Sequence, residues 1–155
     1  MRGLVQRVLR ASVDVVGQDA SVVRCGEIGA GLCVFVGVTH DDRPSTSDKL
    51  AEKIWNLRIL DDAAGVMNRS LAMCAADGES AAILVVSQFT LYGDTDRGRR
   101  PSWVAAARPE HAEPLVARLV DRLEQGGAIV ATGRFRTEMR VEIVNDGPVT
   151  LMLEV

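Results

Sequence analysis

Two uninterrupted apolar runs constrain the fold of this chain more than any other feature of its sequence. GLCVFVGV spans residues 31–38 and AAILVVS spans residues 81–87, and neither run carries a charged residue. Such a run predicts a strand that is covered on both faces, because a strand with one wet face alternates between apolar and polar residues. The chain is therefore expected to build a sheet with protein packed on either side.

The other segments add strands and two helices. Residues 11–15 (ASVDV) alternate with period two before a GQD turn, and AIVAT, MRVEIV and VTLMLEV give three more strand signals near the end. One helix is predicted over roughly 47–60, with Ser47 as its N-cap. A second is predicted over about 110–125, with Gly126 as its stop and with Pro109 and Pro114 in or before its first turn.

This order of elements predicts the fold class. Six or so strands and two helices, without regular βαβ alternation, indicate a mixed α+β (α/β) domain with layered sheets and both helices on one face. At 155 residues, without repeats or a linker, the chain is expected to form one compact domain over 1–155.

Composition narrows the class of function. Hydrophobic residues make up 47% and charged residues 25%, which is typical of soluble proteins, and no apolar run approaches the roughly 18 residues of a membrane helix. Arginines interrupt the start of the chain, so no signal peptide is predicted and a cytoplasmic location is expected. A net charge of −3 argues against a protein that coats nucleic acid.

Neither a metal nor another cofactor is indicated. Cys25, Cys33 and Cys74 are odd in number and lack C-x-x-C spacing, which favours reduced thiols. His40 and His111 lie in polar stretches and are interpreted as surface residues. No cluster of His, Asp and Glu has metal-ligand spacing.

The segment SQFTLYGD (87–94) directly follows a buried strand, where sites are commonly assembled. Ser87 and Thr90 supply hydroxyls and Gln88 an amide, but no G-x-S-x-G motif is present. The alternative is a capped strand end in which Phe89 and Leu91 continue the core.

Two further segments have open interpretations. NDGP (145–148) is a hairpin signal in which Pro148 begins the next strand, or else Gly147–Pro148 is a cis peptide that makes a rigid polar wall. Arg97, Arg99 and Arg100 form either a solvated loop or a phosphate contact.

Together these segments resemble the D-aminoacyl-tRNA deacylase family nearly end to end. The resemblance rests on MRGLVQRV, GEIGAGLCVFVGV, LAEKIWNLRIL, GVMNRS, SQFTLYGDTDRGRRPSW and NDGPVT. It implies hydrolysis of the ester between a D-amino acid and the 3′-terminal adenosine of tRNA, by a metal-free homodimer with its site at the subunit interface. It also implies hydrolysis of glycine mischarged on tRNA(Ala), because glycine has no side chain to exclude.

The resemblance assigns roles by position. Ser87, Gln88, Phe89 and Thr90 form the catalytic segment, in which main-chain N–H groups near Phe89 and Thr90 are candidate oxyanion donors. Water, helped by the ribose 2′-OH, is favoured as the nucleophile over Thr90, because no base adjoins Thr90 in the sequence.

The remaining assignments concern selection and tRNA binding. The cis pair Gly147–Pro148 enters the partner's pocket and excludes L-amino acids, and Arg7 bonds a carbonyl of that segment. Phe135 and Met139 lie near the terminal adenosine or else pack in the core. The arginine cluster contacts the acceptor-stem backbone.

Several residues depart from the family pattern, namely Gly93 in place of Ala, Trp103 in place of Phe, and Arg136–Thr137 in place of Gly-Ala. Arg136 is expected either to strengthen tRNA affinity or to narrow the entrance to the site. Two rival functions stay open: a hydrolase of small D-amino acid esters, and a non-catalytic RNA-binding or interaction protein.

Overall fold

The computed structural model of the protein describes residues 1–96 and 98–155, so Arg97 lies outside the described residues. The elements follow in the order β1 (Arg2–Val16), β2 (Val22–Ile28), β3 (Gly31–Gly37), α1 (Pro44–Trp55), β4 (Leu60–Asp61), β5 (Met67–Arg69), α2 (Leu71–Ala76), β6 (Ala82–Ser87), the 3₁₀ helix η1 (Phe89–Tyr92), α3 (Pro109–Gln125), β7 (Ile129–Thr132) and β8 (Met139–Glu154). Across the described residues, no helix is both long enough and apolar enough to traverse a membrane.

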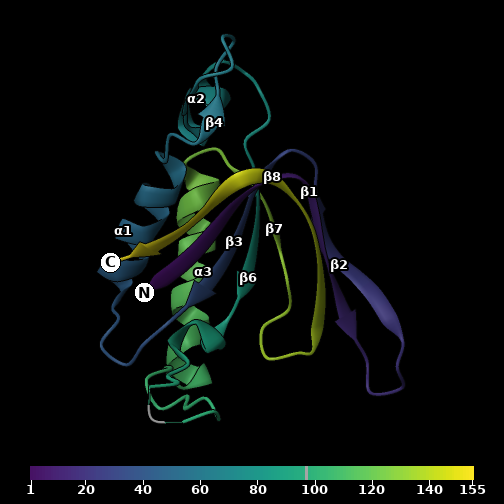
Figure 1. The fold of residues 1–155 in the computed structure, drawn as a ribbon, viewed down its shortest axis with the longest axis vertical. Helices are drawn as coiled ribbons and strands as arrows, with labels where there is room; N and C mark the ends of the chain where they lie inside the picture. The colour runs from purple at the N-terminus through teal and green to yellow at the C-terminus, as the bar shows by residue number, and fades with distance from the viewer. Residues whose placement is uncertain (97) are drawn as a thin grey trace.

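One mixed sheet organises the molecule. Its order is β2-β1-β3-β6-β7, and β8 pairs with β1 along almost its whole length. Strands β3, β6 and β7 run parallel, whereas β1 is antiparallel to each of its neighbours. The first half of β1 pairs with β3 and the second half with β2, so the two long strands link two parts of the sheet (Figure 1).

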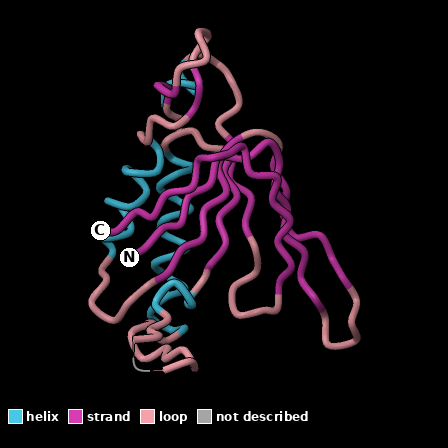
Figure 2. Tube along the Cα trace, in the orientation of Figure 1, coloured by secondary structure: helices cyan, strands magenta, loops and turns pink. Residues whose placement is uncertain are grey.

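Two apolar cores lie on opposite faces of the central strands. Leu32, Val34, Ile83 and Val85 face α1 and α3 in the larger core. The alternate residues, including Cys33 and Leu84, face the outer parts of β1 and β8 in the smaller core. Figure 2 shows the long helices gathered on one side of the strands. The predicted layering of sheets with helices on one face is confirmed, because buried strands need cover on both sides.

The first helix was placed too late in the sequence. It begins at Pro44 after Arg43 and ends at Trp55. Proline at the first position needs no N–H partner and already has a helical φ, so it sets the start. Ser47 is a fully buried residue inside the helix, and its hydroxyl donates to the Leu115 carbonyl at 2.9 Å.

The second helix has the predicted apolar stripe, and Gly126 is its C-cap. Pro114, however, lies inside the helix and beyond its first turn. Because proline has no N–H, the Glu110 carbonyl lacks its usual helical hydrogen bond. Both residues are exposed, so water can donate a hydrogen bond to that carbonyl.

Residues 60–76 form a small unit that was not predicted from the sequence. The short strands β4 and β5 pair, and α2 follows with Ser70 as its N-cap, whose hydroxyl accepts from the Met73 N–H at 3.3 Å. Figure 1 shows this unit projecting from one end of the molecule.

The hairpin interpretation of NDGP is wrong. Residues 139–154 form the single strand β8, with register shifts against β1 where Asn145 pairs with Val8 and Thr150 with Gln6. The Gly147–Pro148 peptide bond is cis.

Candidate active site

A cavity of about 680 Å³ lies where β3 and β6 end. Parallel strands bring their carboxyl ends to one edge of a sheet, which is where ligands bind in open sheets of this kind. The start of α3 forms another wall, and the connection between β7 and β8 forms a third. The lining residues are Val36, Val38, Val86, Ser87, Gln88, Phe89, Trp103, Ala106, Ala107, Arg108, Pro109, Ala112, Val116, Phe135, Arg136, Thr137, Met139 and Val141.

The segment after β6 supplies the polar part of this cavity. The Gln88 N–H donates to the Val36 carbonyl at 2.7 Å, which fixes the turn out of the sheet. The side-chain amide of Gln88 donates to Thr90 Oγ1. Ser87 and Gln88 both line the cavity.

Phe89 does not continue the core, contrary to the alternative reading of this segment. Its side chain is 57% exposed. It packs edge-on against Trp103, with ring centroids 5.4 Å apart and planes at 74°. The two rings form part of the cavity wall, and such pairs add about 0.5–1.5 kcal/mol beyond area burial.

Two main-chain donors of this segment are free. Within the described residues, the N–H groups of Phe89 and Thr90 have no hydrogen-bond acceptor, as expected for the first turn of a helix. Arg2 anchors the turn, because its Nη1 donates to the Leu91 carbonyl at 2.9 Å and its guanidinium lies 4.6 Å from the Tyr92 ring centroid. Burial raises the pKa of Tyr92 to about 12, so its hydroxyl stays protonated.

Neither histidine is placed as a base for Thr90. His40 Nε2 bonds the Val104 carbonyl at 2.8 Å, and His111 Nε2 bonds the Asp42 carbonyl at 2.9 Å. Among the residues that the structure describes, no three His, Cys, Asp or Glu side chains are grouped to hold a metal ion.

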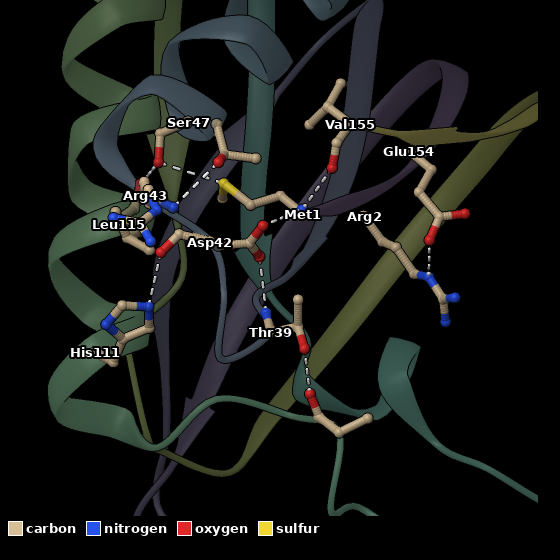
Figure 3. A network of polar contacts seen from close by, with 12 residues as sticks. Met1, Arg2, Thr39, Asp42, Arg43, Ser47, His111, Leu115, Glu154 and Val155 are labelled. Atoms are coloured by element: carbon tan, nitrogen blue, oxygen red, sulfur yellow. Dashed lines mark hydrogen bonds and ion pairs between the residues drawn. The ribbon is translucent and has the colours of Figure 1, made fainter.

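A buried polar network supports the far wall of the cavity (Figure 3). The Met1 amine lies 2.6 Å from Asp42 Oδ1, and Asp42 Oδ2 accepts from the Thr39 N–H at 2.8 Å. The Thr39 hydroxyl donates to the Ala105 carbonyl at 2.6 Å, next to the lining residue Ala106. Asp42 therefore fixes the end of β3 and, through Thr39, the loop beside the cavity.

Phe135 and Met139 both line the cavity, from the β7–β8 connection and the start of β8. Met139 also packs against the smaller core, so its two interpretations are compatible. Arg99 and Arg100 are exposed in the loop after η1, and that loop lies at the cavity end of the molecule (Figure 1). Arg97 falls outside the described residues.

Gly147 and Pro148 lie far from the cavity of their own chain. Across the sheet, Ser87 of β6 pairs with Val36 of β3, which pairs with Gly3 of β1. Gly147 and Pro148 of β8 instead lie opposite Arg7 of β1. Four residues along β1 and three strand spacings across the sheet separate the two places by about 20 Å. The pair is exposed, and the middle of β8 arches over the opposite end of the sheet (Figure 1).

Arg7 supports this segment differently from the expected carbonyl contact. Its Nε lies 2.8 Å from Asp146 Oδ2 as an ion pair without hydrogen-bond alignment, and its Nη1 donates to Asp61 Oδ1 at 2.8 Å. The carbonyl that accepts from Arg7 is that of Ile59, at 3.0 Å.

Sequence reasoning missed Asn145, because NDG was taken for turn residues. Its side-chain amide donates to the carbonyls of Arg7, at 2.8 Å, and of Val149, at 3.1 Å. Asn145 therefore ties β8 to Arg7 of β1 and also closes the bulged stretch of β8 onto Val149.

Comparison with known proteins agrees with this geometry. A family model described as D-Tyr-tRNA(Tyr) deacylase matches residues 4–154. The D-aminoacyl-tRNA deacylase of Symbiobacterium thermophilum is 51% identical over 154 residues, which cover 99% of this chain and 95% of that relative.

Solved structures share the fold. A protein described as the c-Myc DNA unwinding element binding protein is 34% identical, with a TM-score of 0.86 over 100% of this chain and 99% of that one. A probable eukaryotic D-amino acid tRNA deacylase is 17% identical, with a TM-score of 0.80 over 99% and 98% of the two chains, and shows the fold alone.

The fold and the cavity, taken with these likenesses, define a deacylase, which is a hydrolase. The chain belongs to the D-Tyr-tRNA(Tyr) deacylase family.

Proposed function

We propose that this deacylase hydrolyses the ester between a D-amino acid and the 3′-terminal adenosine of tRNA, as a cytoplasmic proofreading enzyme. The observation that carries the proposal is the free N–H group of Phe89, which lines a largely apolar cavity of about 680 Å³, together with the free N–H group of the next residue, Thr90. Such a cavity accommodates the amino acid and its nucleoside, since ligand sites typically measure about 300–1,000 Å³.

The chemistry requires orientation more than activation, because an aminoacyl ester is already reactive. Water adds to the ester carbonyl carbon, and the oxygen that becomes negative accepts from the N–H groups of Phe89 and Thr90. The C–O bond to the ribose then breaks, and the 3′ oxygen leaves with a proton. The neighbouring ribose 2′-OH orients the water and relays that proton, so the RNA supplies the base that the segment lacks.

Thr90 is a scaffold residue in this mechanism. Its Oγ1 already accepts from Gln88, and no basic side chain contacts it among the described residues. We expect Thr90→Val to retain most of the activity. An acyl-Thr90 intermediate trapped by rapid acid quench and mass spectrometry would contradict the water mechanism.

We further propose that the enzyme is a homodimer whose site is completed by the partner. Gly147 and Pro148 are exposed and lie about 20 Å from their own cavity, by strand spacing. Only a second copy can bring such a pair into the cavity, and a two-fold axis would complete both sites at once. Main-chain atoms then occupy the space of an L side chain and exclude it, while D-amino acids and glycine enter. Glycine mischarged on tRNA(Ala) would accordingly be hydrolysed.

The test compares D-tyrosyl-tRNA with L-tyrosyl-tRNA, alongside sedimentation measurements of mass. We expect a dimer that cleaves the D ester alone, and we expect Pro148→Ala to admit the L ester. Pro114→Ala, at an exposed proline of α3, is the matched control. A monomer with full chiral selectivity would overturn the partner's role. Cleavage of neither ester would overturn the enzyme reading and favour the RNA-binding alternative.

Arg99 and Arg100 are proposed to contact the acceptor-stem backbone, as is Arg97, which lies outside the described residues. We expect Arg99→Ala and Arg100→Ala each to raise KM for tRNA substrates and to lessen its salt dependence. If tRNA turnover is unchanged, the small-ester hydrolase gains support.

A further inference from the structure

Two arginines are the only charged residues among the described residues that line the cavity. Arg108 is the N-cap of α3, and Arg136 lies in the connection between β7 and β8. Neither guanidinium has an ion-pair or hydrogen-bond partner in the described part of the chain, although seven other arginines form ion pairs there: Arg2, Arg7, Arg10, Arg24, Arg69, Arg118 and Arg122. An apolar cavity with two unpaired cations on separate walls attracts an anionic group.

The backbone around Arg136 holds this cation in an unusual place. Arg136 has a φ of 57°, in the left-handed region that side chains with a Cβ rarely adopt. The turn is closed by the Thr137 hydroxyl, which donates to the Arg134 carbonyl at 2.9 Å. Residues in such conformations tend to be found where a site needs a fixed side chain.

The opposite wall adds to the positive potential. Helix α3 has 17 residues and begins at Pro109, which lines the cavity beside Arg108. The amino end of a helix carries a partial positive charge from its aligned peptide dipoles. Glu110 offsets part of this charge, but it is not among the lining residues.

We propose that Arg108 and Arg136 together bind the phosphate that joins the last two nucleotides of the tRNA 3′ end. This inference rests on the proposed function. The amino acid in an aminoacyl ester has an ammonium group and an uncharged carboxyl, so the phosphodiester is the anion nearest to the adenosine in every substrate. Guanidinium forks match phosphate oxygens in two parallel hydrogen bonds. Arg136 thereby strengthens tRNA binding rather than narrowing the entrance.

The test uses two D-tyrosyl esters that differ by one phosphate: the ester of adenosine and the ester of the dinucleotide cytidylyl-adenosine. We expect Arg108→Ala and Arg136→Ala each to raise KM for the dinucleotide ester about tenfold, the scale of a charged hydrogen bond. The adenosine ester lacks this phosphate, so its kcat/KM should fall less, and the ratio of kcat/KM between the two esters should drop about tenfold in each variant. The slope of log(kcat/KM) against log salt for the dinucleotide ester should lessen in each variant, by at most about 0.7 in total, because both arginines act on one phosphate.

Three further variants sharpen the reading. Arg134→Ala is the matched control, because Arg134 is exposed in the same connection and does not line the cavity. Arg136→Gly accepts the positive φ, so a loss shared with Arg136→Ala comes from the guanidinium rather than from the backbone. Arg136→Lys should be intermediate, since it keeps the charge and loses the fork.

Equal losses on both esters, or no loss on the dinucleotide ester, would overturn the phosphate contact. A fall in kcat/KM that appears with D-aspartyl esters but not with D-tyrosyl esters would also overturn it. That result would mean that the arginines bind an acidic side chain of the amino acid. A wild-type enzyme that cleaves neither ester would instead overturn the proposed function, and the phosphate contact with it.

Discussion

Gly93 lies against the ring of Trp103, which lines the cavity, and Gly93→Ala should show that these two residues are matched in size. A Cβ on Gly93 would lie well inside 3.0 Å of Trp103 Cζ3, 3.2 Å from Cε3 and 3.1 Å from the Thr90 carbonyl oxygen. The φ of Gly93 is −68°, so alanine meets no backbone penalty there. The two departures from the family pattern at these positions are thus explained together, because a larger ring needs a smaller neighbour.

The cost of Gly93→Ala follows from how Trp103 escapes the clash. Carbon atoms pack at about 3.5 Å, so the indole must withdraw by roughly 1 Å. Trp103 is 42% exposed and has solvent to move into, so the full 1–3 kcal/mol of a buried overpacked site does not apply. This movement breaks the edge-on contact between Trp103 and Phe89, which contributes about 0.5–1.5 kcal/mol to stability. We therefore expect a loss of about 1 kcal/mol.

A double-mutant cycle measures this coupling. Urea unfolding of the wild type, Gly93→Ala, Trp103→Phe and the double variant gives four free energies, with Trp55 as the fluorescent reporter common to all. Phenylalanine lacks the outer ring atoms of indole, so Gly93→Ala should cost almost nothing in that background. A coupling energy below about 0.3 kcal/mol, within the range of independent sites, would refute the reasoning. The single variant should also raise KM, since both rings line the cavity.

Three more predictions test the packing around the site. Asp42→Asn should cost about 3–5 kcal/mol in urea unfolding, because it leaves the buried Met1 amine without its counter-charge, and a loss under 1 kcal/mol would contradict this. A thiol reagent should label exposed Cys25 in the native protein but Cys33 only after unfolding, since burial raises the pKa of Cys33 to about 12; rapid native labelling of Cys33, seen by peptide mass spectrometry, would disagree. Tyr92 is the only tyrosine, and burial raises its pKa to about 12, so its contribution to stability should be complete below pH 10 and be lost as the pH rises towards 12. Ultraviolet titration showing tyrosinate near pH 10 in folded protein would exclude this.

The catalytic segment shows how far sequence reasoning reached. Residues 87–90 were expected at the end of a buried strand, and the structure places Ser87 and Gln88 in the cavity there. The exposure of Phe89 was not predictable from spacing, because its partner Trp103 lies fourteen positions later by the sequence numbering. The same limit hid the network of Asp42, because the Met1 amine that donates to Asp42 lies forty-one positions earlier and also donates to the Val155 carbonyl at the other end of the chain.

The sequence by itself determined which segments are buried. Uninterrupted apolar runs at β3 and β6 and the leucine stripe of α3 each specify a periodicity that one kind of element satisfies. It also specified the layered class, because strands without a polar face need cover on both sides.

Only the tertiary structure decided how NDGP is used and what surrounds the cavity. The motif is compatible with a hairpin, but β1 offers a long edge that pairs with both flanking runs, so the chain continues as one strand. Likewise, Arg108 and Arg136 are remote in sequence and share a cavity because α3 and the β7–β8 connection meet at one edge of the sheet. Local periodicity fixes what each segment buries, whereas long-range pairing fixes which segments meet.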